Sequence, residues 1–235
     1  GISMDESPDL IITMSDYFGN SVASAGDVNG DGYDDVIAGA YAVDSYKGEA
    51  YIFYGGISMD GTADVVLSGE EASSYFGFVV SSTGDVNGDG YKDVIVGADG
   101  YNSDQGRAYI FFGGASMDNT ADITMTGETS TAEFGASVSS AGDVNDDGYS
   151  DVIVGAKGYN SARGRAYIFY GSSSMDNTVD VTFSGENTSD YFGISVSSAG
   201  DVNNDGYSDV IVGAYRFNSY QGKSYIYHGG SSMDY

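Results

Sequence analysis

The sequence lacks several residue types, and each absence excludes a class of site. There is no cysteine, which excludes disulfide bonds and thiolate metal sites. Histidine occurs once in 235 residues, so a zinc motif that requires two histidines is excluded, and no Gly-x-Ser-x-Gly elbow or phosphate-binding loop occurs. Basic residues number 8 against 35 acidic ones, a formal net charge of −27. Such a chain is repelled by phosphates, so we expect no binding to DNA, RNA or an anionic membrane surface.

Long hydrophobic runs and helical patterns are missing as well. No apolar stretch is long enough to cross a bilayer, so we expect no direct membrane insertion. No signal peptide or lipidation motif is visible, and no segment shows a helical period. The 36 glycines, the single proline and the abundance of tyrosine are typical of a turn-rich all-β protein.

A nine-residue acidic pattern, Asp-Val-Asn-x-Asp-Gly-Tyr-x-Asp, appears four times, first at residues 27–35. Later copies begin at Asp85, Asp143 and Asp201, so the period is 58 residues. Each copy has side-chain oxygens at positions one, three, five and nine and a glycine at position six. Oxygen ligands at this spacing suit calcium, a hard cation that tolerates irregular geometry. A constant period near 50 residues predicts an array of structural repeats.

Each repeat is predicted to contain four strands. They are a short edge strand, a Phe-Gly segment of small residues, a buried Val/Ile strand directly after the acidic stretch, and an aromatic strand. Radial repetition of such sheets is a β-propeller. We therefore predict a single all-β domain over residues 1–235, built of four four-stranded antiparallel blades. The predicted blades span approximately residues 1–55, 56–113, 114–171 and 172–235.

With these motifs, the chain resembles the FG-GAP repeat family, which forms the blades of integrin α-subunit propellers and of microbial relatives. The matching motifs are Phe-Gly at 18–19, 76–77, 134–135 and 192–193, and Gly-Ala at 39–40, 97–98, 155–156 and 213–214. The resemblance implies one Ca²⁺ per acidic stretch, four in total, with the tyrosine at position seven binding through its backbone carbonyl. The implied ligands are Asp27, Asn29, Asp31, Tyr33 and Asp35; Asp85, Asn87, Asp89, Tyr91 and Asp93; Asp143, Asn145, Asp147, Tyr149 and Asp151; Asp201, Asn203, Asp205, Tyr207 and Asp209.

Two features depart from the family pattern. The proline that usually follows Gly-Ala is absent, and the family usually closes with seven blades whereas four are present here. We predict a ring of four blades, closed by an N-terminal outer strand at Leu10 to Met14 that completes the last blade. The alternatives are a fragment of a larger ring and a homo-oligomer in which several chains complete one ring.

Other calcium folds and enzyme sites fit less well. An EF-hand loop needs a bidentate Glu at position twelve. Position twelve here is aliphatic and lies inside the buried strand, as Ala38 in the first repeat. The single histidine, His228, replaces an aromatic residue at a strand end, and the acidic pair Glu70 and Glu71 lies in a polar turn. We therefore do not expect an enzyme.

The loops between the Val/Ile strand and the aromatic strand of a blade are expected to lie opposite the acidic stretches. Repeats one and four carry tyrosines there, so a closed ring is expected to cluster Tyr41, Tyr46, Tyr215, Arg216 and Tyr220. We expect this cluster to bind a glycan or protein ligand. The predicted function is an extracellular calcium-binding module for adhesion or ligand recognition, secreted or on a microbial cell surface and part of a larger protein. The alternatives are a purely structural or self-assembling module, and an accessory domain of a carbohydrate-active enzyme.

Overall fold

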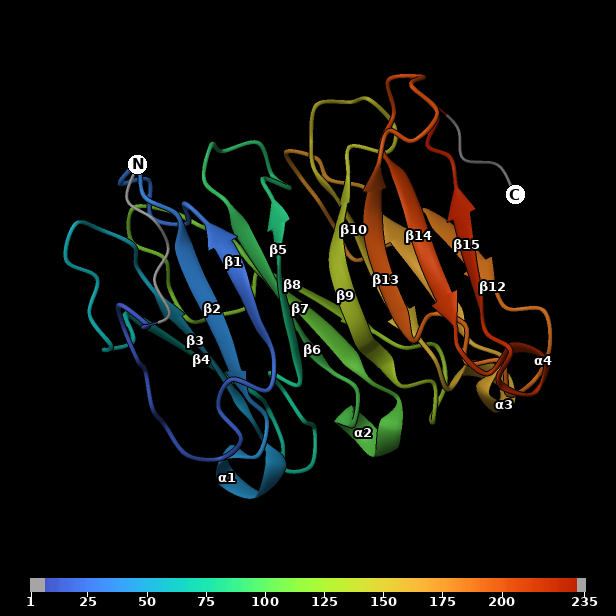
Figure 1. Cartoon of the computed structure of the whole chain (residues 1–235), viewed down its shortest axis with the longest axis horizontal. Coiled ribbons are helices and arrows are strands. Elements are labelled where there is room, and N and C mark those ends of the chain that lie inside the picture. Colours follow the sequence, from blue (N-terminus) through green and yellow to red (C-terminus); the bar gives the residue numbers. More distant parts are fainter. Residues whose placement is uncertain (1–6, 232–235) are drawn as a thin grey trace.

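The computed structural model describes residues 7–231 and consists of short antiparallel strands arranged as four consecutive sheets (Figure 1). Within each sheet the strands are hydrogen-bonded in chain order. Blade one contains β1 (Val22–Gly26), β2 (Asp35–Ala40), β3 (Glu49–Phe53) and β4 (Val65–Ser68). Blade two contains β5 (Val79–Gly84), β6 (Asp93–Ala98), β7 (Arg107–Phe111) and β8 (Ile123–Thr126). Blade three contains β9 (Phe134–Gly142), β10 (Asp151–Ala156), β11 (Arg165–Phe169) and β12 (Val181–Ser184). Blade four contains β13 (Ser195–Gly200), β14 (Asp209–Ala214) and β15 (Lys223–Tyr227).

The hydrophobic core lies between blades. Three buried clusters are present, and each draws its side chains from two consecutive sheets. In the first cluster Ile37 and Leu67 of blade one lie with Val94 and Tyr109 of blade two. The Val/Ile strands β6 and β10 are buried along their whole length because both of their faces meet such a cluster. Each blade is therefore stabilised mainly by its neighbours.

The Phe-Gly and Gly-Ala motifs meet where one blade touches the next. A Cβ atom placed on Gly39 would lie 1.9 Å from the carbonyl oxygen of Gly77 in the following blade. The same contact recurs at Gly97, where the distance is 2.1 Å, and at Gly155, where it is 2.0 Å. Backbone approaches backbone at these points, so only glycine fits.

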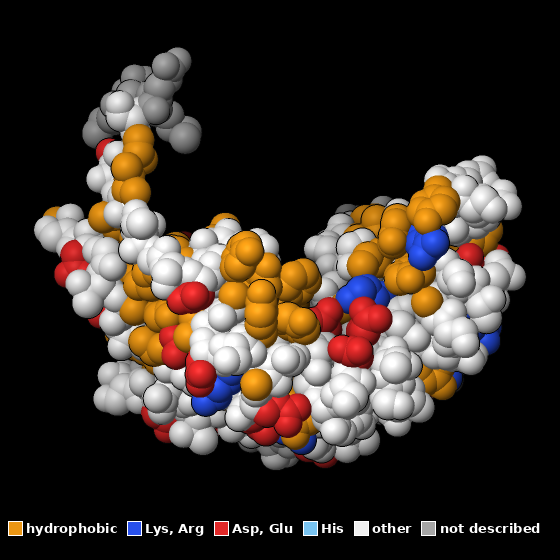
Figure 2. Space-filling view, turned by 90° about the horizontal axis from the view of Figure 1, so that it is seen from below, with side chains coloured by type: hydrophobic (Ala, Val, Ile, Leu, Met, Phe, Trp, Pro, Cys, Tyr) orange, Lys and Arg blue, Asp and Glu red, His pale blue; other side chains and the backbone are white. Residues whose placement is uncertain are grey.

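The ring of four blades expected from the sequence is not closed in this structure. Seen from the edge that bears α1–α4, the molecule is an open crescent (Figure 2), with blades one and four at its two ends (Figure 1). Residues 9–13 form no strand, Ile11 is 72% exposed, and the last sheet has three strands within the described residues. The three blade interfaces share the same glycine contacts and thus turn the chain similarly, and three such turns leave the ends apart.

The connections between second and third strands are tight helical turns rather than irregular loops. They are α1 (Val43–Tyr46), α2 (Tyr101–Asp104), α3 (Tyr159–Ala162) and α4 (Phe217–Tyr220). In each turn the last three residues have positive φ. These turns lie along the lower edge in Figure 1, and because the strands are antiparallel the acidic loops lie at the opposite edge. Among residues 7–231, none of the helices is long and apolar enough to cross a membrane.

Candidate calcium-binding loops and tyrosine clusters

Each acidic stretch forms the loop between the first and second strands of its blade, and all four loops fold alike. The Asp at position one accepts a hydrogen bond from the N–H of the glycine at position six, at 2.9 to 3.0 Å. The Asp at position five accepts one from the tyrosine N–H at position seven, at 2.9 to 3.0 Å. The Asn at position three accepts the N–H of position five in every loop. The predicted ligands at positions one, three and five thus face the inside of their own loop backbone.

Position nine fixes the loop to the sheet. Asp35, Asp93, Asp151 and Asp209 begin the second strands and are fully buried. One carboxylate oxygen accepts the N–H of position two at 2.8 Å in all four loops. The other oxygen accepts a glycine N–H just after the third strand, at 2.7 to 2.9 Å. Position nine therefore closes the loop, as its place before the buried strand predicts.

Neighbouring loops are hydrogen-bonded to one another. The carbonyl of Asp27 accepts the N–H of Lys92 in the next loop at 3.0 Å, and the carbonyl of Val28 accepts the N–H of Gly114 at 2.7 Å. The equivalent pairs recur between loops two and three and between loops three and four. The acidic loops therefore form one continuous row along this edge of the crescent.

Burial makes the charge at position nine unfavourable in the metal-free protein. Burial is the largest of several influences that together raise the pKa of Asp93 and of Asp151 to about 7, and the aspartates at positions five and one of the same loop act in the same direction. The two backbone N–H bonds to each carboxylate act in the opposite direction. The pKa of Asp35 is raised for the same reasons. A cation in the loop would remove this cost by favouring the ionised form.

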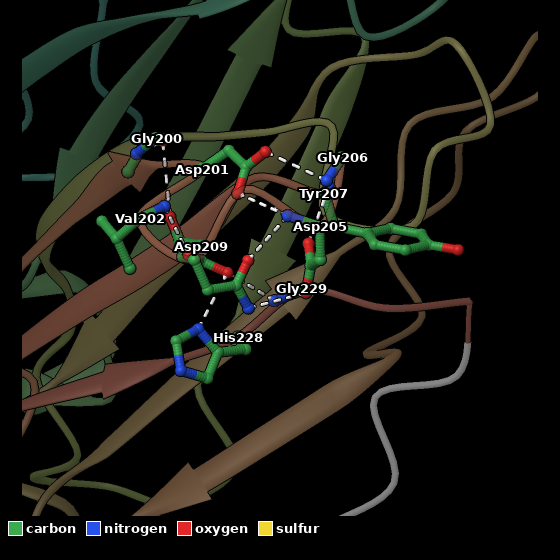
Figure 3. Close-up of polar contacts among 11 residues, drawn as sticks. Gly200, Asp201, Val202, Asp205, Gly206, Tyr207, Asp209, His228 and Gly229 are labelled. Atoms are coloured by element: carbon green, nitrogen blue, oxygen red, sulfur yellow. Dashed lines mark hydrogen bonds and ion pairs between the residues drawn. The ribbon is translucent and has the colours of Figure 1, made fainter.

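The fourth loop differs through a contact that sequence reasoning missed. His228 Nδ1 lies 3.3 Å from Asp209 Oδ1 (Figure 3), whereas the repeat pattern predicts for this histidine only a place at a strand end. Burial is again the largest influence on Asp209 and raises its pKa, but the N–H groups of Gly229 and Val202, together with His228, outweigh it and lower the pKa. The only signal in the sequence was the replacement of Tyr or Phe by histidine at this position of the repeat. That the position lies beside a loop carboxylate is known from the structure.

The donor chemistry of the loops fits calcium, but their carboxylates do not converge. Each loop offers three carboxylates, an amide oxygen and backbone carbonyls, a set of hard oxygen ligands. Within residues 7–231 no three acidic or histidine side chains surround a common point at metal-binding distance. The carboxylates accept backbone N–H bonds instead, and because each oxygen has two lone pairs these bonds leave acceptor capacity for a cation. The structure gathers the predicted ligands into single loops, and the metal remains a prediction.

The predicted ligand-binding residues fall into two groups, so the expectation of one cluster is not met. Tyr41 and Tyr46 lie 6.2 Å apart and belong to an aromatic group with Tyr17, Tyr75 and Phe78, here called the blade-one tyrosine cluster. Because the crescent is open, repeats one and four are not neighbours, and the hydrophobic side chains on this edge form separate patches towards either end (Figure 2).

The other predicted residues form a second group, the blade-four tyrosine cluster, with Tyr191, which the sequence did not suggest. The rings of Tyr215 and Tyr220 are 6.2 Å apart. The Arg216 guanidinium lies 4.8 Å from the ring centroids of both Tyr191 and Tyr220. An adjacent pocket of about 540 Å³ is lined by Arg216, Tyr220 and polar residues between 187 and 190. A flat aromatic surface beside a cation and hydrogen-bonding groups can bind a polar ligand such as a sugar.

All four repeats of the chain match one family model. The model described as FG-GAP repeat matches residues 18–53, 76–111, 134–169 and 192–227, which together cover more than half of the chain. Each match begins at the phenylalanine of a Phe-Gly motif, includes one acidic loop, and ends in the third strand of its blade. The chain therefore belongs to the FG-GAP repeat family.

Proposed function

We propose that this protein is a non-catalytic, calcium-binding propeller module that acts outside the cell in adhesion or ligand recognition. FG-GAP repeats and the four antiparallel sheets support a propeller-type binding module. The observation that carries the calcium proposal is the set of internal hydrogen bonds shared by four loops that are rich in carboxylates and have one spacing.

Calcium would stabilise the fold by bringing a positive charge into each loop. Extracellular calcium modules bind with dissociation constants of about 10⁻⁴ to 10⁻³ M, and external calcium is abundant enough to fill such sites. A site filled to tenfold above its dissociation constant adds roughly 1.4 kcal/mol to the free energy of unfolding. We expect a chelator to lower the melting temperature strongly and calcium to restore it. An unchanged melting curve in EDTA would contradict the proposal.

The third loop offers a matched pair of variants. Asp147 stands at position five and is a predicted ligand, whereas Asp146 stands at position four and is not. Asp147→Asn and Asp146→Asn remove the same charge from adjacent residues of one loop. Titration calorimetry should show one calcium fewer per chain for Asp147→Asn and an unchanged stoichiometry for Asp146→Asn. Equal effects of both variants would mean that only the total charge matters.

We further propose that the ligand, a glycan or a protein, binds at the edge bearing α1–α4, opposite the calcium loops. The supporting observation is the exposure of aromatic side chains there, among them Tyr46 at 44% and Tyr220 at 64%. A glycan array should identify the class of ligand. Tyr46→Ala and Tyr220→Ala then distinguish the two tyrosine clusters, and Tyr33→Ala, an exposed tyrosine on the acidic edge, is the control. Binding that is unaffected by Tyr46→Ala and Tyr220→Ala alike would contradict this location.

A further inference from the structure

The two ends of the crescent expose the two halves of an interface that the molecule already forms three times. In each internal interface, the trailing face of one blade, which contacts the next blade, packs on the leading face of its successor. Among the described residues, no blade packs on the leading face of blade one or on the trailing face of blade four (Figure 1). Residues on these two faces are more exposed than the equivalent residues in the three internal interfaces.

The leading face of blade one is an open apolar groove. Val22 is 69% exposed, whereas its equivalents Val80 and Val138 are 4% and 6% exposed. Val36 is 37% exposed, whereas its equivalent Val94 is fully buried. Together with Leu10, Ile12, Phe18 and Phe53, these side chains line a groove of about 540 Å³.

The trailing face of blade four is the complementary surface. Ile226 is 52% exposed, whereas Ile52, Ile110 and Ile168 at the same place in the other blades are fully buried. The same holds at position two of the acidic loop. Val202 is 52% exposed, and its equivalents in loops one to three are fully buried.

The backbone at the two ends is complementary in the same way. Within the molecule, the carbonyls of positions one and two of one loop accept N–H groups from the next blade. At the free ends the corresponding carbonyls belong to Asp201 and Val202, and the corresponding N–H groups to Asp34 and Gly56. The two glycines of the interblade contact are also present at the free ends. Gly213 of blade four and Gly19 of blade one are the equivalents of the internal pairs, and a Cβ atom on Gly19 would meet nothing within 4 Å.

Within residues 7–231 no outer strand pairs with β15 of blade four, and residues 9–13 resemble such a strand. In blades one to three an Asp precedes the outer strand and accepts an N–H from the end of the third strand at 2.7 Å. Asp9 precedes Leu10, Ile11 and Ile12 in the same manner. The outer edge of β15 pairs with no strand among the described residues, and an unpaired edge of this kind is a template for strand addition.

From these observations we propose that two copies of this chain join head to tail into a closed ring. The trailing face of blade four in one copy packs on the leading face of blade one in the other, and residues 9–13 add the fourth strand to the partner's β15. An interface between two different surfaces forms a ring when its rotation closes. The new interfaces repeat the internal ones, so they continue the curvature of the crescent instead of straightening it.

The mass of the protein in solution tests this proposal. Light scattering on the purified chain, in about 0.15 M salt so that charges beyond about 8 Å are screened, should give twice the 24.5 kDa of one chain. A mass of one chain over the whole accessible concentration range would overturn the proposal. So would a polymer whose mass grows steadily with concentration, because it would mean that the ring does not close.

A mixing experiment tests the head-to-tail geometry. Val22→Asp blocks the leading face, Ile226→Asp blocks the trailing face, and both side chains are already exposed in the single chain, so the fold should tolerate them. Each variant alone should be monomeric. Mixed, they should form a heterodimer, because the trailing face of the Val22→Asp chain and the leading face of the Ile226→Asp chain are both intact. A variant that remains dimeric alone, or a mixture that remains monomeric, would overturn the proposal.

Ile57→Asp is the matched control for introducing a charge at an exposed isoleucine. Ile57 is 91% exposed, and its equivalents Ala115 and Ser173 remain exposed although their blades follow a neighbour in the array. This variant should dimerise like the parent protein. Its failure to do so would mean that the other variants act through net charge and not through the end faces.

Discussion

Gly39, Gly97 and Gly155 each lie against the carbonyl oxygen of a glycine in the following blade. Any side chain there would have to push two backbones apart, because the contact is not with the flexible end of a side chain. The two motifs that define the repeat are therefore the two sides of one contact. The buried aspartate at position nine has a similar role within a blade, since it ties the acidic loop to the segment after the third strand.

Gly97→Ala should destabilise the protein although it adds a single methyl group. The new Cβ would lie 2.1 Å from Gly135 O, so blades two and three would have to separate. Overpacking of this kind typically costs about 1–3 kcal/mol. Denaturant unfolding measures the loss. Gly114→Ala, where a Cβ meets nothing within 4 Å, is the control and should unfold at nearly the parent's midpoint. Equal midpoints for both variants would contradict the close-contact explanation.

Residue-level prediction succeeded where the sequence spacing determines the geometry. The acidic loops, their closure at position nine and their place between first and second strands follow from a pattern that occurs four times. The contact of His228 with Asp209 did not follow, because it depends on where the end of β15 lies relative to a loop about twenty residues earlier. The separation of the tyrosines into two clusters depends on the curvature of the whole array, and this curvature cannot be predicted from a local sequence pattern.

At the scale of elements, the turns α1–α4 are the least expected part of the structure. The sequence pattern predicted only loops at these places, and the structure shows three consecutive residues with positive φ in each turn. Asn tolerates this region well, but in α3 the third such residue is Ala162, with φ of 59°. Ala162 has a Cβ atom that disfavours the left-handed region, so the surrounding structure holds it in this conformation.

Ala162→Gly should stabilise the protein slightly. Glycine avoids a left-handed penalty of roughly 1–2 kcal/mol but loses roughly 0.5–1 kcal/mol of chain entropy, so a net gain of up to about 1.5 kcal/mol remains. Chemical denaturation measures the difference. Ala72→Gly is the control. Ala72 is exposed and is not among the positive-φ residues, so its replacement should destabilise the protein through entropy alone. A loss of stability in Ala162→Gly would show that the turn is not strained.

The strands themselves were largely predictable. Val/Ile runs became the buried second strands, and the short runs at 64–67, 122–125 and 180–183 contribute to the outer strands. The run at 9–13 has the same composition and forms no strand. A strand needs a partner as well as a propensity, and in this structure the third strand that it would pair with lies at the far end of the crescent (Figure 1).

At the scale of the whole molecule, net charge is the dominant electrostatic feature. With 35 acidic and 8 basic residues the folded chain repels itself. In a chelator, raising sodium chloride from about 0.05 to about 0.5 M should therefore raise the melting temperature, because screening shortens the range of the repulsion. Calorimetry in calcium and in magnesium at equal ionic strength separates this general effect from specific binding. Identical melting temperatures in the two cations would mean that screening alone stabilises the fold.

The number of blades and the fold of each blade could be read from the repeat, but ring closure could not. Closure depends on the angle between consecutive blades, and that angle is determined by contacts such as the glycine pairs and the packing of Tyr109 and Phe111 against blade one. Small differences in such an angle accumulate over four blades. The sequence therefore predicts which faces of consecutive blades pack together, but not the total rotation from the first blade to the last.

The contact between glycine backbones has an evolutionary consequence. The backbone contact of each glycine pair carries almost no information about which repeat stands on either side, and the Val/Ile and aromatic strands that pack around it are nearly the same in every repeat. Any blade of this family pattern can therefore follow any other. Duplication or loss of a 58-residue unit would then preserve every joint and alter only the length of the array. Repeat number is free to vary by recombination, and selection can act on the size of the assembly without first redesigning its interfaces.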